Sequence, residues 1–202
     1  MQIWRDRLGR WLRPLARRSP LSPNAITVVA LLLNLAAAVT LAMGLIHPVL
    51  FLVSIPLTGV GGLCDALDGA VARERNLRTD FGDFLDHLFD RISDASLTVG
   101  WIVGTAVRPS IGAAAVVGVM LNGYIGTQIE ATWGRRSYEG TGRGEFIVAL
   151  LVYPVTAYLL ARNGASQMRW LTLTVPEWLT AAMALLAFLG IGQRFREASL
   201  LG

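Results

Sequence analysis

Residues 65–90 read DALDGAVARERNLRTDFGDFLDHLFD, an acidic stretch within a chain that is otherwise strongly apolar. Of the 202 residues, 53% are hydrophobic and only 16% are charged, a composition that is typical of membrane proteins. A lone carboxylate in hydrocarbon is energetically costly, so a cluster of them needs bound cations, a water-filled cavity, or both. The stretch therefore predicts a polar site inside a membrane protein.

Six apolar segments include or flank this stretch. They cover residues 25–45, 49–67, 84–107, 111–133, 146–161 and 178–192. At about 1.5 Å of rise per residue, each approaches the roughly 30 Å of a bilayer core. We expect an all-α integral membrane protein of one domain, residues 1–202, in which residues 23–196 form a six-helix transmembrane bundle. Residues 1–20 place apolar side chains at helical spacing among six arginines, which predicts an amphipathic helix on an anionic membrane surface.

The arginine distribution indicates the orientation in the cell membrane. All 18 basic residues are arginine. If the N-terminus is cytoplasmic, 14 of them fall in inside segments, Arg91 lies within a helix, and only Arg108, Arg162 and Arg169 fall outside. The positive-inside rule then predicts a multi-pass protein with both termini and the loop at 74–80 in the cytoplasm. The pI near 10 reflects this topology and contact with anionic lipid, and we expect no nucleic-acid partner.

Four carboxylates recur at helical spacing. Asp65 and Asp68 are three residues apart and share one helix face, while Asp86 and Asp90, four apart, share a face of the next helix. Two adjacent antiparallel helices would bring them together as a four-carboxylate cage at the cytoplasmic end of the bundle. Hard oxygen ligands of this kind favour Mg²⁺ or Mn²⁺.

Small residues and one cation accompany these acids. Gly69 and Gly82 remove side chains beside the cage, where a bulky ligand could approach the backbone, and Ala72 is likewise small. Arg73 supplies a positive charge where a diphosphate would sit.

Three other interpretations are open for the acidic cluster. The acids could cap helices and pair with neighbouring arginines, which explains neither the glycines nor the excess of carboxylates. A divalent-cation transporter would use intramembrane carboxylates, but it gives Gly69, Ala72, Arg73 and Gly82 no role. A non-catalytic membrane scaffold would need neither the four carboxylates nor the small residues and arginine beside them.

The spacing of eight residues resembles the complete signature of the CDP-alcohol phosphotransferase family. The matching residues are Asp65, Asp68, Gly69, Ala72, Arg73, Gly82, Asp86 and Asp90. Pro-Asn-x-Ile-Thr at 23–27 is also similar to the family's entry into its first helix. Gly126-Thr127-Gln128 and the loop at 134–145 resemble members that use inositol phosphate, namely phosphatidylinositol-phosphate and archaetidylinositol-phosphate synthases. Phe146 stands where those members often have a basic residue.

The resemblance implies an enzyme of phospholipid biosynthesis that works as a homodimer. It would transfer a substituted phosphate from a CDP-linked lipid to an acceptor hydroxyl and release CMP. The resemblance also assigns roles to the eight positions: Asp65, Asp68 and Asp86 as metal ligands, Asp90 as a ligand or the general base, and Gly69, Ala72, Arg73 and Gly82 as the lining of the CDP pocket.

The acceptor is predicted from arginines at the cytoplasmic mouth. Arg91, Arg135, Arg136 and Arg143 favour an acceptor that itself carries phosphate, because arginine binds phosphate in a bidentate manner. We rank inositol phosphate first and glycerol 3-phosphate second, with neutral alcohols such as serine or free inositol behind.

Overall fold

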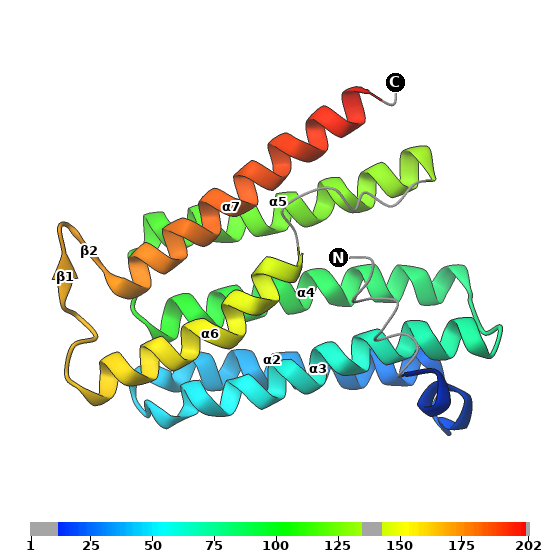
Figure 1. The fold of residues 1–202 in the computed structure, drawn as a ribbon, viewed down its shortest axis with the longest axis horizontal. Coiled ribbons are helices and arrows are strands. Elements are labelled where there is room, and N and C mark those ends of the chain that lie inside the picture. The colour runs from blue at the N-terminus through cyan, green and yellow to red at the C-terminus, as the bar shows by residue number, and fades with distance from the viewer. Residues whose placement is uncertain (1–11, 135–142, 201–202) are drawn as a thin grey trace.

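The computed structural model describes residues 12–134 and 143–200, most of which lie in long helices (Figure 1). In chain order the elements are α2 (Pro23–Ala42), the 3₁₀ turn η1 (Met43–Leu45), α3 (Val49–Glu74), α4 (Asp80–Gly104), α5 (Pro109–Trp133), α6 (Arg143–Arg162), β1 (Arg169–Trp170), β2 (Leu173–Thr174) and α7 (Val175–Ser199). Residues 12–18 are helical as well. Six helices therefore lie where the sequence predicts six apolar segments.

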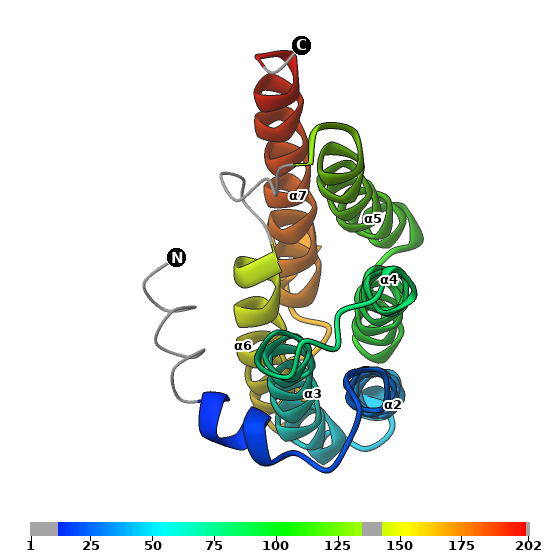
Figure 2. The ribbon, with the colours of Figure 1, turned by 90° about the vertical axis from the view of Figure 1, so that its right-hand side faces the viewer.

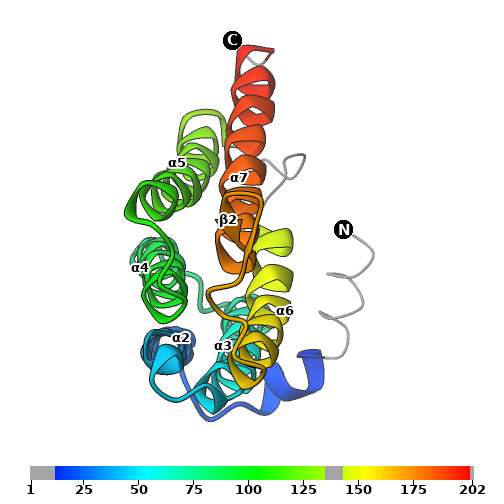
Figure 3. The same cartoon turned by 90° about the vertical axis from the view of Figure 1, so that its left-hand side faces the viewer.

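The helices form two rows when the bundle is seen end-on (Figures 2 and 3). One row contains α2, α4 and α5, and the other contains α3, α6 and α7. Helix α2 packs against both α3 and α4, α5 packs against α4 and α7, and α3 packs against α6. Within the described residues, α3 and α4 do not pack closely on each other. The two helices that carry the signature are therefore held in place largely through α2.

Glycines bring α2 and α4 into close contact. A methyl group at Gly100 or Gly104 of α4 would overlap the backbone carbonyl of Ala38 or Leu41 in α2. Small residues at such contacts let helix backbones approach closely, which is how helices associate in a membrane where apolar burial supplies little drive. The absence of side chains at Gly100 and Gly104 therefore allows the short distance between α2 and α4.

Short polar caps set where the helices begin. Ser22 accepts a hydrogen bond from the Ala25 amide and caps the first long helix, whose first position is Pro23. Thr79 caps α4 by accepting from the Gly82 amide at 3.0 Å. Together these caps place the entrance of α2 and the first turn of α4 at the same end of the bundle.

Four helices are long and apolar enough to cross a membrane: Pro23–Leu45, Val49–Glu74, Pro109–Trp133 and Val175–Ser199. Helix α4 carries several acids, and the apolar part of α6, Ala149–Arg162, is shorter. The chain is thus a mostly helical, multi-pass membrane protein.

The structure differs from the prediction of an all-α chain, and it describes only part of the predicted surface helix. Residues 169–174 form a two-stranded antiparallel hairpin that pairs Arg169 with Thr174 and Trp170 with Leu173. The prediction of an all-α chain missed it because two-residue strands are too short to give an alternating pattern. Of the predicted surface helix at 1–20, residues 1–11 lie outside the described range.

The described part of the N-terminal segment docks against α3. Leu12 and Ala16 are buried in a cluster that includes Ala70 and Val71. Arg13 and Arg17 both pair with Glu74, with Nε–carboxylate distances of 3.2 and 2.9 Å. These contacts pin the segment to the helix turn that bears the signature.

Candidate active site

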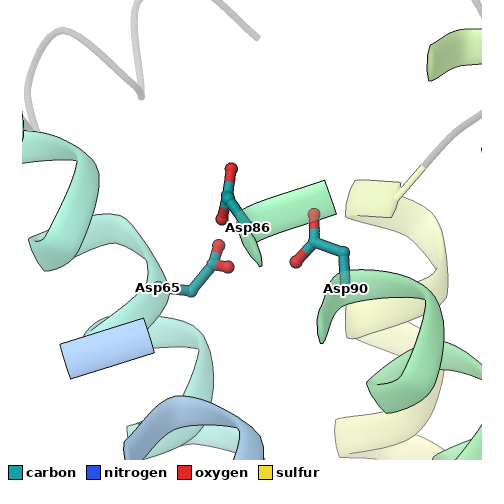
Figure 4. Close-up of side chains that lie close together, drawn as sticks. All are labelled: Asp65, Asp86 and Asp90. Carbon is teal, nitrogen blue, oxygen red and sulfur yellow. The ribbon is translucent and has the colours of Figure 1, made fainter. Parts of the chain in front are cut away.

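Three of the four predicted carboxylates converge between α3 and α4. Asp65 points from α3 toward Asp86 and Asp90 of α4 (Figure 4). One ligand oxygen from each lies within 4.8 Å of the others. Oxygens on opposite sides of an ion bound at about 2.1 Å lie about 4.2 Å apart. Only a small inward shift would therefore let all three bind one Mg²⁺-sized ion.

Asp68 is not one of those three, but it lies close behind them. It is buried, with 5% of its surface exposed, it interacts electrostatically with Asp65 and Asp86, and it lies close to Thr27 of α2. Its Oδ2 atom is buried with no hydrogen-bond partner among the described residues. Buried polar atoms in native proteins are almost always satisfied, so an orphaned carboxylate oxygen fits a site made to hold a cation.

Two predicted CDP-binding residues, Gly69 and Gly82, lie in the same helices as the carboxylates, next to Asp68 in α3 and one turn before Asp86 in α4. A methyl group at Gly82 would lie 3.1 Å from Thr79 Oγ1 and 3.2 Å from Asn24 Oδ1, and one at Gly69 would lie 3.3 Å from Arg73 Nη1. A side chain at position 82 would therefore crowd Thr79 and Asn24 where α2 meets the first turn of α4.

Ala72 and Arg73 open onto a hollow of about 340 Å³ that Asn76 and Arg78 complete. The hollow follows directly after the turns of α3 that carry Asp65 and Asp68. Its lining carries two guanidinium groups, which suits an anionic ligand.

Two arginines form a cationic pair beside α5. Arg91, which follows Asp90, forms an ion pair with Asp94 at 3.0 Å, as its position one turn away predicts. Arg194 of α7 donates to the Asn122 backbone carbonyl at 2.6 Å, and the two guanidinium groups repel each other. The Nε atoms of Arg91 and Arg194 are buried with no hydrogen-bond partner among the described residues.

Glycines in α5 make the room for this pair. A methyl group at Gly123 would overlap the Arg91 guanidinium, and one at Gly126 would overlap that of Arg194. The two glycines are three residues apart and share one face of α5. Two cations held close together, each with an unused donor, form a site that suits an anion.

The sequence alone did not identify Arg194 as the partner of Arg91, nor Gly123 and Gly126 as the residues that make room for the two side chains. The Gly-x-x-Gly spacing in α5 is a signal that could have pointed to a close contact there. The remaining predicted arginines cannot be compared: Arg135 and Arg136 lie outside the described residues, as does the side chain of Arg143.

The profile of one protein family, CDP-alcohol phosphatidyltransferase, matches residues 20–191. The chain belongs to the CDP-alcohol phosphatidyltransferase family. It is 28% identical over 187 residues to the archaetidylinositol phosphate synthase of Methanothermobacter thermautotrophicus, covering 93% of this chain and 86% of the relative.

Solved structures agree with this assignment. The fold matches phosphatidylinositol phosphate synthase of Mycobacterium tuberculosis in complex with manganese and citrate, with a TM-score of 0.67 and 26% identity over 92% of this chain and 87% of that one. The same enzyme with CDP-DAG bound gives a TM-score of 0.64 at 27% identity, covering 93% and 91% of the two chains.

Family membership decides between the functional classes. This CDP-alcohol phosphatidyltransferase is a membrane enzyme of phospholipid biosynthesis that transfers a substituted phosphate from a CDP-linked donor to an acceptor hydroxyl and releases CMP. A divalent metal supports the reaction. The transporter and scaffold alternatives are therefore set aside.

Proposed function

We propose that the acceptor is inositol phosphate, so that the enzyme makes a phosphatidyl- or archaetidylinositol phosphate. The observation that carries this is the Arg91–Arg194 pair, whose buried Nε donors have no partner within the described residues. Arginine binds phosphate through paired N–H donors, and two guanidinium groups held together are stabilised by a dianion between them. The relatives named above, an archaetidylinositol phosphate synthase and a phosphatidylinositol phosphate synthase, support the same acceptor.

Glycerol 3-phosphate carries the same phosphate and is the second candidate. Serine and free inositol rank behind because neither carries a phosphate for the arginine pair to bind. Arg135, Arg136 and Arg143 stay predicted contributors to the acceptor site.

In the proposed site, Asp65, Asp68, Asp86 and Asp90 hold Mg²⁺ or Mn²⁺, since an all-carboxylate ligand set favours hard cations. The metal, when bound, neutralises the phosphates of the CDP-linked lipid. Gly69, Ala72, Arg73 and Gly82 line the CDP pocket, where Arg73 faces the hollow described above.

Asp90 is the proposed general base. It lies with Asp65 and Asp86 at the proposed metal site, where an acceptor hydroxyl that attacks the diphosphate of the donor would come within reach of its carboxylate. Asp90 takes the hydroxyl proton as the acceptor oxygen bonds to the lipid-bearing phosphorus, and the bond from that phosphorus to CMP breaks. CMP leaves with the electron pair of that bond.

Truncating Arg194 should separate acceptor binding from donor binding. Loss of a charge-assisted hydrogen bond costs about 1.5–3 kcal/mol, so Arg194→Ala should raise the KM for inositol phosphate roughly 10- to 100-fold while the KM for CDP-lipid stays near that of the wild type. Arg196→Ala, on the exposed surface of the same helix, is the matched control and should change neither value.

Two results would contradict the acceptor assignment. One is a wild-type enzyme that transfers to free inositol or serine and ignores both phosphorylated polyols. The other is an Arg194→Ala variant whose two KM values rise equally, which would make the arginine a structural residue only.

We further propose that all six helices cross the membrane, that residues 1–20 lie on its surface, and that residues 1–202 form a single domain. The five-residue link at 75–79 brings α4 back at the end where α3 leaves, so α4 must traverse the bundle alongside α2. The arginines at the two ends of the bundle support an orientation. One end carries Arg73, Arg75, Arg78, Arg194 and Arg196, and the other carries Arg108, Arg162 and Arg169. By the positive-inside rule, the site and both termini face the cytoplasm. The homodimer stays a prediction.

Thiol labelling tests this orientation. In a Cys64→Ser background, which removes the lone cysteine, an impermeant reagent on intact cells should label Met168→Cys and spare Ser199→Cys. Met168 is 71% exposed beside the hairpin, and Ser199 ends α7. The opposite labelling pattern would invert the orientation.

A further inference from the structure

Asn34 is a polar residue in the middle of the most apolar span of the chain. Its neighbours in α2 read ALLLNLAAA. Polar side chains inside a membrane span are costly, and those that occur are commonly held by contacts between helices. The position of Asn34 therefore calls for a specific partner.

The Asn34 amide contacts both helices that carry the carboxylates. Its Nδ2 donates to Ser93 Oγ of α4 at 3.3 Å. On the other side it meets α3, where a methyl group at Gly61 would lie 2.5 Å from Asn34 Oδ1. A side chain at 61 would displace the amide, so Gly61 lets Asn34 lie between α2 and α3 at this level of the bundle.

These contacts lie one helical turn deeper in the membrane than the metal site. Gly61 is four residues before Asp65, or about 6 Å along α3, and Ser93 is three residues after Asp90, or about 4.5 Å along α4. Helices α3 and α4 do not pack closely on each other in the described part of the chain, and each packs against α2. Asn34 thus lies on α2 between α3 and α4, about one helical turn further into the membrane than the carboxylates.

We propose that Asn34 is a positioning residue for the metal site. Its amide holds α3 and α4 at the separation at which Asp65 can meet Asp86 and Asp90. This inference rests on the metal site proposed above. Three carboxylates that repel one another need a rigid support, because functional sites lose binding when their ligands move by fractions of an ångström.

Direct Mn²⁺ binding is the readout, with the purified full-length protein in detergent and no lipid substrate. Free Mn²⁺ is measured by electron paramagnetic resonance. Loss of a residue that supports metal ligands commonly weakens metal binding 10- to 100-fold, so Asn34→Leu and Gly61→Ala should each raise the Mn²⁺ Kd about tenfold or more. The milder Asn34→Ala should raise it less.

A double variant tests the contact itself. Gly61→Ala introduces a methyl group against the amide, and Asn34→Ala removes the amide. The combined variant should therefore bind Mn²⁺ more tightly than Gly61→Ala alone.

Thr180→Val is the matched structural control. It removes another buried interhelical hydrogen bond, the 2.9 Å bond from Trp101 Nε1 between α4 and α7, away from the carboxylates. It should lower the melting temperature and leave the Mn²⁺ Kd unchanged.

Wild-type Kd values for both Asn34→Leu and Gly61→Ala would overturn the positioning role. So would a Thr180→Val variant whose Kd rises as much as theirs, because the effect would then follow general stability. A wild-type protein that binds no Mn²⁺ would overturn the metal site itself, a result distinct from the other two.

Discussion

Replacing Asp90 with asparagine should abolish transfer while CDP-lipid binding persists. Asparagine keeps an oxygen near the position of the carboxylate, so the proposed metal site loses charge but retains its shape. It cannot take the proton of the acceptor hydroxyl, and loss of a general base costs about 10²- to 10⁴-fold in rate. Release of CMP and binding of CDP-lipid, measured on the same preparation, separate the two effects.

Two further variants frame this result. Asp65→Ala should lose both CDP-lipid binding and turnover, because it removes the only one of the three converging carboxylates that α3 supplies and leaves no oxygen in its place. Asp83→Asn removes an exposed acid from the first turn of α4 and should leave both intact. Near-normal turnover in Asp90→Asn would refute the general-base role.

The acidic helix pair was predictable from the sequence because helical spacing is local information. Three- and four-residue intervals put the aspartates on shared faces, and a short cytoplasmic link brings the two faces together. The structure places Asp65, Asp86 and Asp90 as that reasoning predicts. Asp68 is not one of these three: it is buried close to Thr27 of α2. This position depends on how α2 packs against α3, which the spacing of the aspartates does not predict.

The arginine pair shows what sequence alone could not supply. Arg91 was identified from its place beside Asp90. Arg194 is more than 100 residues away, and from the sequence alone it is one of the arginines that indicate the cytoplasmic side. Its role depends on the packing of α7 against α5. The same holds for Asn34, which reads as an isolated polar residue until α3 and α4 are placed around it.

Removing the metal should have an effect as large as removing the base. Three carboxylates within 4.8 Å of one another repel each other, and a CDP-linked donor would add two phosphate charges. Without a cation these charges exclude the donor from the site. An all-oxygen ligand set accepts Mg²⁺ or Mn²⁺ and has little preference for softer metals.

The most direct measurement is CMP release by purified enzyme that has been stripped with chelator and checked by metal analysis. It is followed with CDP-lipid and inositol phosphate, before and after Mg²⁺ or Mn²⁺ is restored. We expect no release above background from the stripped enzyme. After metal is restored, we expect one CMP for each phosphorylated inositol lipid formed. Full turnover in the metal-free sample, or CMP release without an inositol lipid product, would contradict metal-dependent transfer to inositol phosphate.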